Sequence, residues 1–231
     1  MALFDDIYVR YRNIRRSIAK SLFRRRMRDR FLKAAYYCAA LQGESNYNIC
    51  INSDLTVSCN CRDYAGRGII GDLRQNSLEE IFAGETARRF RQHLAEGRFA
   101  VPECADCWEM KPVSPGQAQS LLESFHPPVD GIMVENTSRC NLRCRACARE
   151  VLRSTRRQDD MSLDDIDCVA REIARIGIRE VAFHNLGEPF LTRRILDELR
   201  ILRDRLPEVH LYTSTNGVLL DSHEKREAAL H

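Results

Sequence analysis

The pattern of apolar and polar positions divides the chain into two parts. After residue 130, short apolar segments alternate with longer segments of helical periodicity. We expect strands at residues 131–136, 180–184 and 209–213, and helices opening at Ser162, covering residues 195–206 and starting at Ser222. Repeated strand–helix units form a parallel α/β sheet, and such sheets carry their functional residues at the carboxyl ends of the strands.

The pattern before residue 130 is less regular. Two short apolar segments, residues 47–50 and 56–59, flank the polar residues 52–54, which predicts a hairpin with a polar turn. Ser77 and Glu80 form the capping box of a helix that we expect to run toward Gly97. This part is therefore a small α+β domain.

The N-terminus has a different composition. Between Arg10 and Lys33, arginines accompany apolar residues at helical spacing, which predicts a basic amphipathic helix. Such a helix docks on an acidic partner, an anionic membrane surface or RNA, or it packs against its own protein. With prolines and glycines breaking up residues 113–130, the expected division is a basic helical segment at 1–45, a cysteine-rich domain at 46–112, a linker at 113–130 and a sheet domain at 131–231.

Composition narrows the functional classes. Of the 231 residues, 44% are hydrophobic, and the formal net charge is only +3, too small for general electrostatic attraction to nucleic acid. No apolar run approaches the roughly 20 residues of a membrane span, and charged residues occupy the place of a signal peptide's apolar stretch. We therefore expect no transmembrane segment and a cytoplasmic location.

The ten cysteines change this picture most. A reducing compartment disfavours a disulfide framework, so their clustering predicts metal or iron–sulfur ligation. Cys140, Cys144 and Cys147 lie on one loop directly after a predicted strand. Three thiolates hold three irons of a four-iron cubane and leave the fourth iron open for another ligand. Structural zinc prefers four ligands, and no fourth cysteine or histidine lies near in sequence.

This C-x-x-x-C-x-x-C segment resembles the radical S-adenosylmethionine (SAM) superfamily, and two later segments agree. Residues 186–189, with Gly187, Glu188 and Pro189, are similar to the family's Gly-Gly-Glu-Pro segment, although Leu186 replaces the first glycine. Residues 214–217 are similar to the segment that approaches the ribose and carboxylate of SAM. The resemblance covers residues 131–231.

The resemblance implies a fold, a cofactor and a set of roles. The fold is a partial (β/α) barrel of about six strands, but the sequence has room for three, so that it is a fragment or needs another chain. A [4Fe–4S] cluster on the three cysteines would reduce SAM to a 5′-deoxyadenosyl radical that abstracts a substrate hydrogen. Glu188 and the backbone near Gly187 would hold the amino group of SAM, and Ser214 and Asn216 would lie nearer its ribose and carboxylate.

Four other cysteines can form a second site. Cys50, Cys59, Cys104 and Cys107 make up a hairpin pair and a C-x-x-C pair, and Cys61 is an alternative to Cys59. Residues 71–82 together with the C-x-x-C pair resemble the SPASM domain of peptide-modifying radical SAM enzymes. The resemblance implies an auxiliary [4Fe–4S] cluster that relays electrons or anchors substrate; structural zinc is the competing interpretation.

Two further cysteines are not expected to bind metal. Cys38 has no second cysteine at ligand spacing, so we expect a small buried apolar residue there. Cys168 projects away from the apolar stripe of its predicted helix and is expected to be incidental.

The function expected is that of a radical SAM enzyme supplied with electrons by a flavodoxin or ferredoxin. The SPASM resemblance favours a peptide or protein substrate, although related architectures also act on small molecules. Two other functions remain open. One is an iron–sulfur electron-transfer or binding module that does not turn over SAM, and the other is an interaction protein stabilised by zinc.

Overall fold

The computed structural model describes residues 35–45 and 48–228. The main sheet has six strands in the order β4-β3-β2-β6-β7-β8. In chain order they are β2 (Cys50–Ile51), β3 (Thr56–Ser58), β4 (Ile69–Asp72), β6 (Ile132–Val134), β7 (Glu180–Ala182) and β8 (His210–Tyr212). The basic helix predicted between Arg10 and Lys33 lies outside the described residues.

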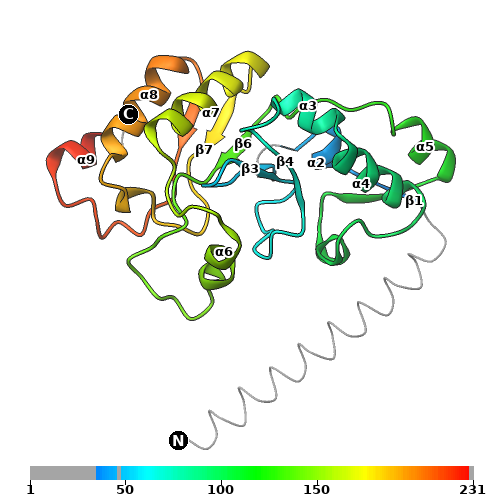
Figure 1. Cartoon of the computed structure of the whole chain (residues 1–231), viewed down its shortest axis with the longest axis horizontal. Helices are drawn as coiled ribbons and strands as arrows, with labels where there is room; N and C mark the ends of the chain where they lie inside the picture. Colours follow the sequence, from blue (N-terminus) through cyan, green and yellow to red (C-terminus); the bar gives the residue numbers. More distant parts are fainter. Residues whose placement is uncertain (1–34, 46–47, 229–231) are drawn as a thin grey trace, which may run out of the picture.

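The second part of the chain has the predicted parallel α/β arrangement. Strand β7 pairs in parallel with both β6 and β8. Helices α7 (Leu163–Ile176) and α8 (Ile195–Arg205) lie on one side of these strands (Figure 1). The Ser162 capping box begins α7 as predicted, and the helix ends at Gly177, which adopts the left-handed conformation.

The hairpin of the first part joins this sheet directly. Strands β2 and β3 pair antiparallel around the polar turn, as predicted. On its other edge β2 pairs in parallel with β6, with Cys50 opposite Met133 and Ile51 opposite Val134. The two predicted domains therefore share one sheet, which the sequence pattern did not indicate.

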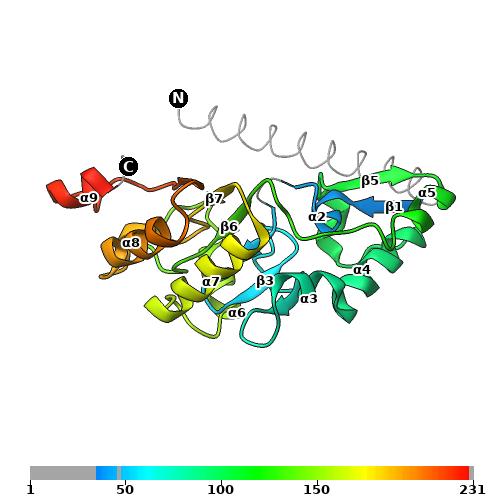
Figure 2. The same ribbon diagram turned by 90° about the horizontal axis from the view of Figure 1, so that it is seen from above.

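The remaining elements surround the hairpin and the parallel strands. They are β1 (Ala35–Cys38), α2 (Ala39–Gln42), α3 (Leu78–Ala83), α4 (Glu85–Ala95), the 3-10 helix η1 (Pro102–Asp106), β5 (Met110–Val113), α5 (Pro115–Ser120), α6 (Arg149–Thr155), the 3-10 helix η2 (Pro189–Leu191) and α9 (His223–Ala228). Strands β1 and β5 form a separate antiparallel pair at one end of the molecule, and α9 lies at the other end (Figure 2).

Three expected boundaries differ from the structure. The helix that begins after Ser77 is interrupted at Gly84, whose extended backbone separates α3 from α4. The segment predicted as helical up to residue 45 contains strand β1, because residues 35–38 pair with β5. The expected linker at 113–130 is partly ordered, since Ser114 and Gln117 form a capping box that begins α5.

The two faces of the sheet are packed differently. Side chains alternate along each strand, so Ile132 and Val134 face the large core under the helices, whereas Met133 faces the other side. Met133 packs there with Cys50 and Ala182. Among the helices of the described residues, none combines the length and apolar character needed to span a membrane.

Candidate functional site

The three cysteines of the C-x-x-x-C-x-x-C segment lie on the loop between β6 and α6. Cys140 is partly buried, and Cys144 and Cys147 are exposed. The loop leaves the carboxyl end of β6, which is where parallel α/β sheets place their chemistry. Exposed thiols at this position are accessible to a metal cluster.

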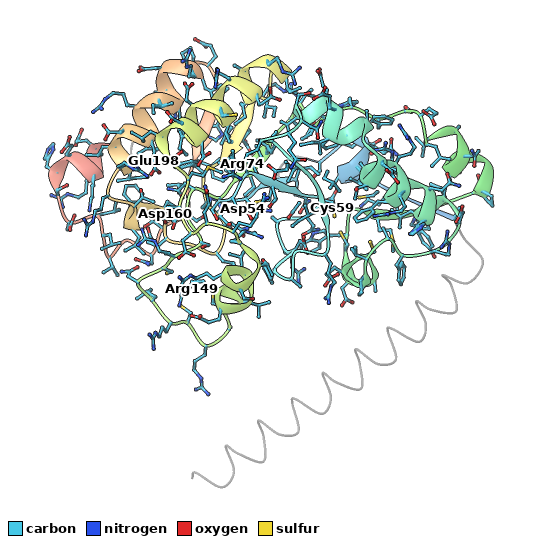
Figure 3. The ribbon with its side chains drawn as sticks, in the orientation of Figure 1. Asp54, Cys59, Arg74, Arg149, Asp160 and Glu198 are labelled. Atoms are coloured by element: carbon cyan, nitrogen blue, oxygen red, sulfur yellow. The ribbon has the colours of Figure 1, made fainter. Side chains whose placement is uncertain are left out.

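The base of this loop is held by a carboxylate pair. Thr137 Oγ1 donates to Asp160 at 2.6 Å, and Arg139 Nε donates to the same carboxylate at 2.8 Å. Ser138 Oγ donates to Asp159 at 2.8 Å. Asp160 lies between the main sheet and α6 (Figure 3). These contacts fix residues 137–139, so that the cysteines start from a defined anchor.

Gly187 packs against this anchor so closely that no side chain fits. A Cβ atom there would lie 1.9 Å from the carbonyl oxygen of Thr137. The next backbone N–H, that of Glu188, donates to the Arg139 carbonyl at 2.7 Å. Glycine is therefore required because the second segment approaches the backbone of the cysteine loop. Pro189 follows as the first residue of η2 and is buried.

The Glu188 carboxylate links the second segment to the third. It is only 2% exposed and accepts hydrogen bonds from Thr215 Oγ1 at 2.6 Å, Asn216 N at 2.8 Å and Phe190 N at 3.1 Å. A carboxylate offers about four acceptor positions. Glu188 thus has room for about one further donor, and much of its role is to join the two strand-end segments.

Asn216 connects the third segment to the cysteine loop. Its Nδ2 donates to Asn141 Oδ1 at 2.9 Å and approaches Cys140 Sγ at 3.8 Å. Ser214 is exposed, and its backbone N–H donates to His184 Nδ1 at 3.2 Å. Burial lowers the pKa of His184, which agrees with a neutral ring accepting this bond. The structure therefore brings all three predicted segments together at the ends of β6, β7 and β8.

A second group of thiols lies in the N-terminal part. Cys38, Cys59, Cys104 and Cys107 line one cavity beside α4. Burial raises the pKa of Cys38 to about 12 and the pKa of Cys59 well above its usual value. Such thiols stay protonated until a metal displaces the proton. Four sulfur donors in one cavity suit a fully ligated iron–sulfur cluster.

Cys50 is not in this group, and Cys38 takes the place expected for it. Cys50 pairs with Ser58 across the hairpin. Cys59 is the residue after Ser58, so its side chain points to the face of the sheet opposite to that of Cys50. Cys50 instead packs with Met133 and accepts a hydrogen bond from Asn185 Nδ2 at 3.6 Å. Strand alternation, applied to the predicted hairpin, would have separated Cys50 from Cys59 in advance.

Cys61 also lies apart from the four-thiol cavity. It packs against the face that carries Cys50, and its Sγ lies 3.7 Å from Asn48 Oδ1. Within the described residues, no three His, Cys, Asp or Glu side chains converge on the position of a single metal ion. The four thiols share a cavity rather than a ready single-ion site.

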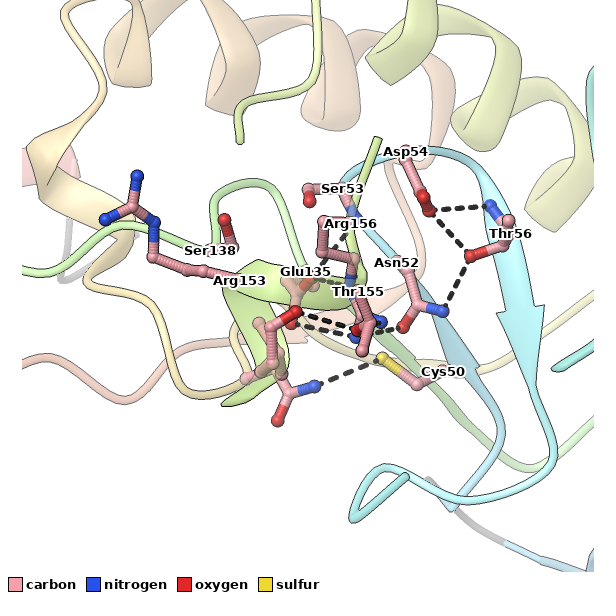
Figure 4. Close-up of polar contacts among 12 residues, drawn as sticks. Cys50, Asn52, Ser53, Asp54, Thr56, Glu135, Ser138, Arg153, Thr155 and Arg156 are labelled. Carbon is pink, nitrogen blue, oxygen red and sulfur yellow. Dashed lines mark hydrogen bonds and ion pairs between the residues drawn. The ribbon is translucent and has the colours of Figure 1, made fainter. Parts of the chain in front are cut away.

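A buried ion pair between the end of β6 and the segment after α6 also contacts the hairpin turn (Figure 4). Arg156 Nε donates to Glu135 Oε1 at 2.7 Å, and both side chains are at most 2% exposed. Arg156 Nη2 also donates to Asn52 Oδ1 in the hairpin turn at 2.8 Å. Ser53 and Gln158 exchange two further hydrogen bonds, of 2.9 and 2.7 Å. The position of the cysteine loop is thus coupled to the N-terminal hairpin.

Comparison with known families agrees with both groups of cysteines. The model of the radical SAM superfamily matches residues 134–230, and that of the SPASM iron–sulfur cluster-binding domain matches residues 38–108. Residues 134–230 are thus similar to the radical SAM superfamily. The SPASM match begins at Cys38 and includes all six cysteines of the N-terminal part, which are Cys38, Cys50, Cys59, Cys61, Cys104 and Cys107. The two domains imply a [4Fe–4S] cluster with SAM and support a second iron–sulfur cluster.

Curated relatives of the radical SAM domain are similar over a limited length. A GTP 3',8-cyclase of Clostridium perfringens is 33% identical over 102 residues, covering 43% of this chain and 31% of the relative. A probable GTP 3',8-cyclase of Pyrococcus abyssi is 29% identical over 110 residues, which cover 48% of this chain and 35% of the relative. The GTP 3',8-cyclase of Acidothermus cellulolyticus is 32% identical over 120 residues, which cover 48% of this chain and 33% of the relative. The chain thus spans about a third of the length of these relatives. No solved structure matches it.

Proposed function

We propose that this chain is part of a radical SAM enzyme whose cluster is held by Cys140, Cys144 and Cys147. When bound, the cluster supplies the electron that cleaves SAM to methionine and a 5′-deoxyadenosyl radical, which abstracts hydrogen from the substrate. Three thiolate ligands would leave one iron of such a cluster without a protein ligand, which would be available to the amino and carboxylate groups of SAM.

The chain's own residues orient SAM. Backbone groups beside Gly187 and the remaining acceptor position of Glu188 are suited to the amino group, because an ammonium is a donor only. Ser214 has an exposed hydroxyl for the ribose or carboxylate. Asn216 is suited to position the Cys140 side of the cluster, since its amide already lies near that sulfur.

The observation that carries the proposal is the hydrogen-bonded convergence of the three segments. Asn216 contacts the cysteine loop at Asn141, and Glu188 binds both Thr215 and the backbone of Asn216. Residues that are distant in sequence thereby surround one loop with three thiols. Four thiols in the N-terminal cavity support an auxiliary cluster that relays electrons or anchors substrate.

A peptide or protein is the substrate class we propose, on the strength of the SPASM domain. A nucleotide is the second candidate, because the curated relatives are named GTP 3',8-cyclases. The electron donor proposed is a small acidic carrier such as a flavodoxin or ferredoxin.

Formation of 5′-deoxyadenosine tests this function. Anaerobically reconstituted protein, reduced with dithionite in the presence of SAM, is expected to release deoxyadenosine that chromatography detects. Cys144→Ala removes a proposed ligand and is expected to abolish the product while the N-terminal cysteine site keeps its metal. Undiminished product from this variant contradicts the ligand assignment. SAM binding without cleavage by cluster-loaded protein supports an electron-transfer or binding module instead.

A further inference from the structure

A hollow of about 300 Å³ lies between the N-terminal domain and the helix that follows the cysteine loop. Its lining includes Arg62, Tyr64, Cys107, Trp108, Ala148 and Val151. The volume is at the lower end of the range of ligand pockets, about 300–1,000 Å³. A hollow of this size accommodates a side chain or a small group rather than a folded partner.

The hollow exposes apolar surface to water. Trp108 is 69% exposed and Val151 is 51% exposed, and both belong to the few large apolar side chains that are exposed in the described part of the chain. Exposed apolar side chains that line one hollow offer surface for an apolar group of a ligand. Trp, Tyr and Arg, which all occur here, are also the residues that dominate binding energy at protein interfaces.

One charged side chain of the lining, Arg62, has no ion-pair partner among the described residues. Glu103 is paired with Arg67, and Asp106 is a second carboxylate of the lining, with an interaction partner of its own. Arg62 is exposed and makes no ion pair within residues 35–45 and 48–228. A bound group with an acidic residue at its edge complements this guanidinium.

The hollow touches both candidate cluster sites. Cys107 belongs to the four-thiol group, and Ala148 directly follows Cys147 of the cysteine loop. A molecule that binds here contacts both domains, which the hydrogen bond from Arg156 to Asn52 of the hairpin turn joins. The location suits a substrate that must be held beside the radical chemistry.

We propose that this hollow is a docking site for a peptide segment of the substrate, with an apolar side chain inserted beside Trp108 and an acidic neighbour facing Arg62. The inference rests on the proposed function, since it names where that substrate is held. A peptide is favoured over a nucleoside triphosphate because one uncompensated guanidinium is a poor match for a multiply charged phosphate chain. Apolar Val151, which lines the hollow together with Tyr64 and Trp108, is likewise suited to an aliphatic or aromatic side chain.

Trp108 is the single tryptophan of the chain, so its fluorescence reports directly on this hollow. The probe is a short peptide in which leucine and phenylalanine are flanked by aspartates, titrated under anaerobic conditions into the reconstituted protein. We expect a saturable change in tryptophan emission below about 1 mM. A peptide of the same sequence with lysines in place of the aspartates is expected to bind at least about tenfold more weakly.

Two variants and two matched controls locate the binding. Arg62→Glu and Val151→Ser are each expected to weaken binding of the aspartate peptide by roughly tenfold. Arg89→Glu and Val129→Ser change an exposed cation and an exposed apolar residue outside the hollow, and we expect them to leave binding unchanged.

The outcomes separate this inference from the proposed function. The absence of any emission change up to about 1 mM peptide, or an emission change with GTP in place of the peptide, overturns the docking site. Equal losses in the controls also overturn it. Deoxyadenosine formation is measured separately, so peptide binding without that product contradicts the radical chemistry and leaves the docking site standing.

Discussion

The thiol of Cys38 is 9% exposed and lines the same cavity as the C-x-x-C pair. We expect Cys38→Ala to remove a cluster ligand from the N-terminal domain, with a loss of up to about four irons per chain. Cys50→Ala removes a thiol of similar burial on the other face of the hairpin, and we expect its iron content to match the wild type. Iron and acid-labile sulfide analysis after anaerobic reconstitution measures both.

Cys168→Ala is the control for loss of a thiol outside both groups. If Cys50→Ala loses the iron and Cys38→Ala retains it, the four-thiol set given by the structure is refuted. This residue-level contrast depends on strand alternation alone, because Cys50 and Cys59 lie at opposite-facing positions of one hairpin.

Glu198 is a buried carboxyl whose protonation affects stability. It is 0% exposed and accepts a hydrogen bond from Asn136 Nδ2 at 2.8 Å. Burial raises its pKa above the ordinary 4.5. The folded state therefore holds this proton more tightly than the unfolded state, and stability falls as pH rises above 4.5 through the raised pKa.

The Gln side chain of Glu198→Gln stays neutral at every pH, so we expect this variant to lack the loss of stability that accompanies rising pH. Its free energy of unfolding, relative to that of the wild type, should rise between pH 5 and pH 8. Urea unfolding followed by circular dichroism measures the difference. A difference that is flat across this range, or that falls, contradicts the raised pKa.

At the scale of secondary-structure elements, the Arg156–Glu135 pair connects the segment after α6 to the end of β6. Arg156→Met leaves Glu135 buried without its partner, and we expect a loss of about 3–5 kcal/mol in unfolding free energy. Replacing both residues, with Glu135→Leu and Arg156→Met, is expected to recover most of the loss because no buried charge remains unpaired. Chemical denaturation of the two variants and the wild type measures this.

An Arg156→Met variant with the same unfolding free energy as the wild type would contradict this prediction. The double variant also separates two causes, since a double variant no more stable than Arg156→Met points to the hydrogen bond from Arg156 to Asn52 rather than to the unpaired charge.

Elements with strong local signals could be predicted from the sequence. The Ser162 capping box, the hairpin turn and the three strands after residue 130 all have local patterns, and the structure has them. The pairing of β2 with β6 could not be predicted, because a strand of two residues, Cys50–Ile51, carries no periodicity that selects a partner. The pairing of β1 with β5 depends likewise on contacts between residues far apart in sequence.

At the scale of the whole molecule, one sheet contains strands from both parts of the chain. The convergence of residues 137–141, 187–188 and 214–216 could be predicted, because parallel strands place their carboxyl ends at the same edge. The role of Cys38 could not be predicted from spacing, since its neighbours in the cavity, Cys104 and Cys107, are more than sixty positions away in the sequence.

The central claim is that two cysteine groups hold two iron–sulfur clusters, of which the group on residues 140–147 serves SAM. Iron, acid-labile sulfide and zinc per chain after anaerobic reconstitution test it most directly. We expect about eight irons with matching sulfide in the wild type, and about four in Cys144→Ala. About four irons with one zinc would assign structural zinc to the N-terminal group, and zinc without sulfide would contradict the account.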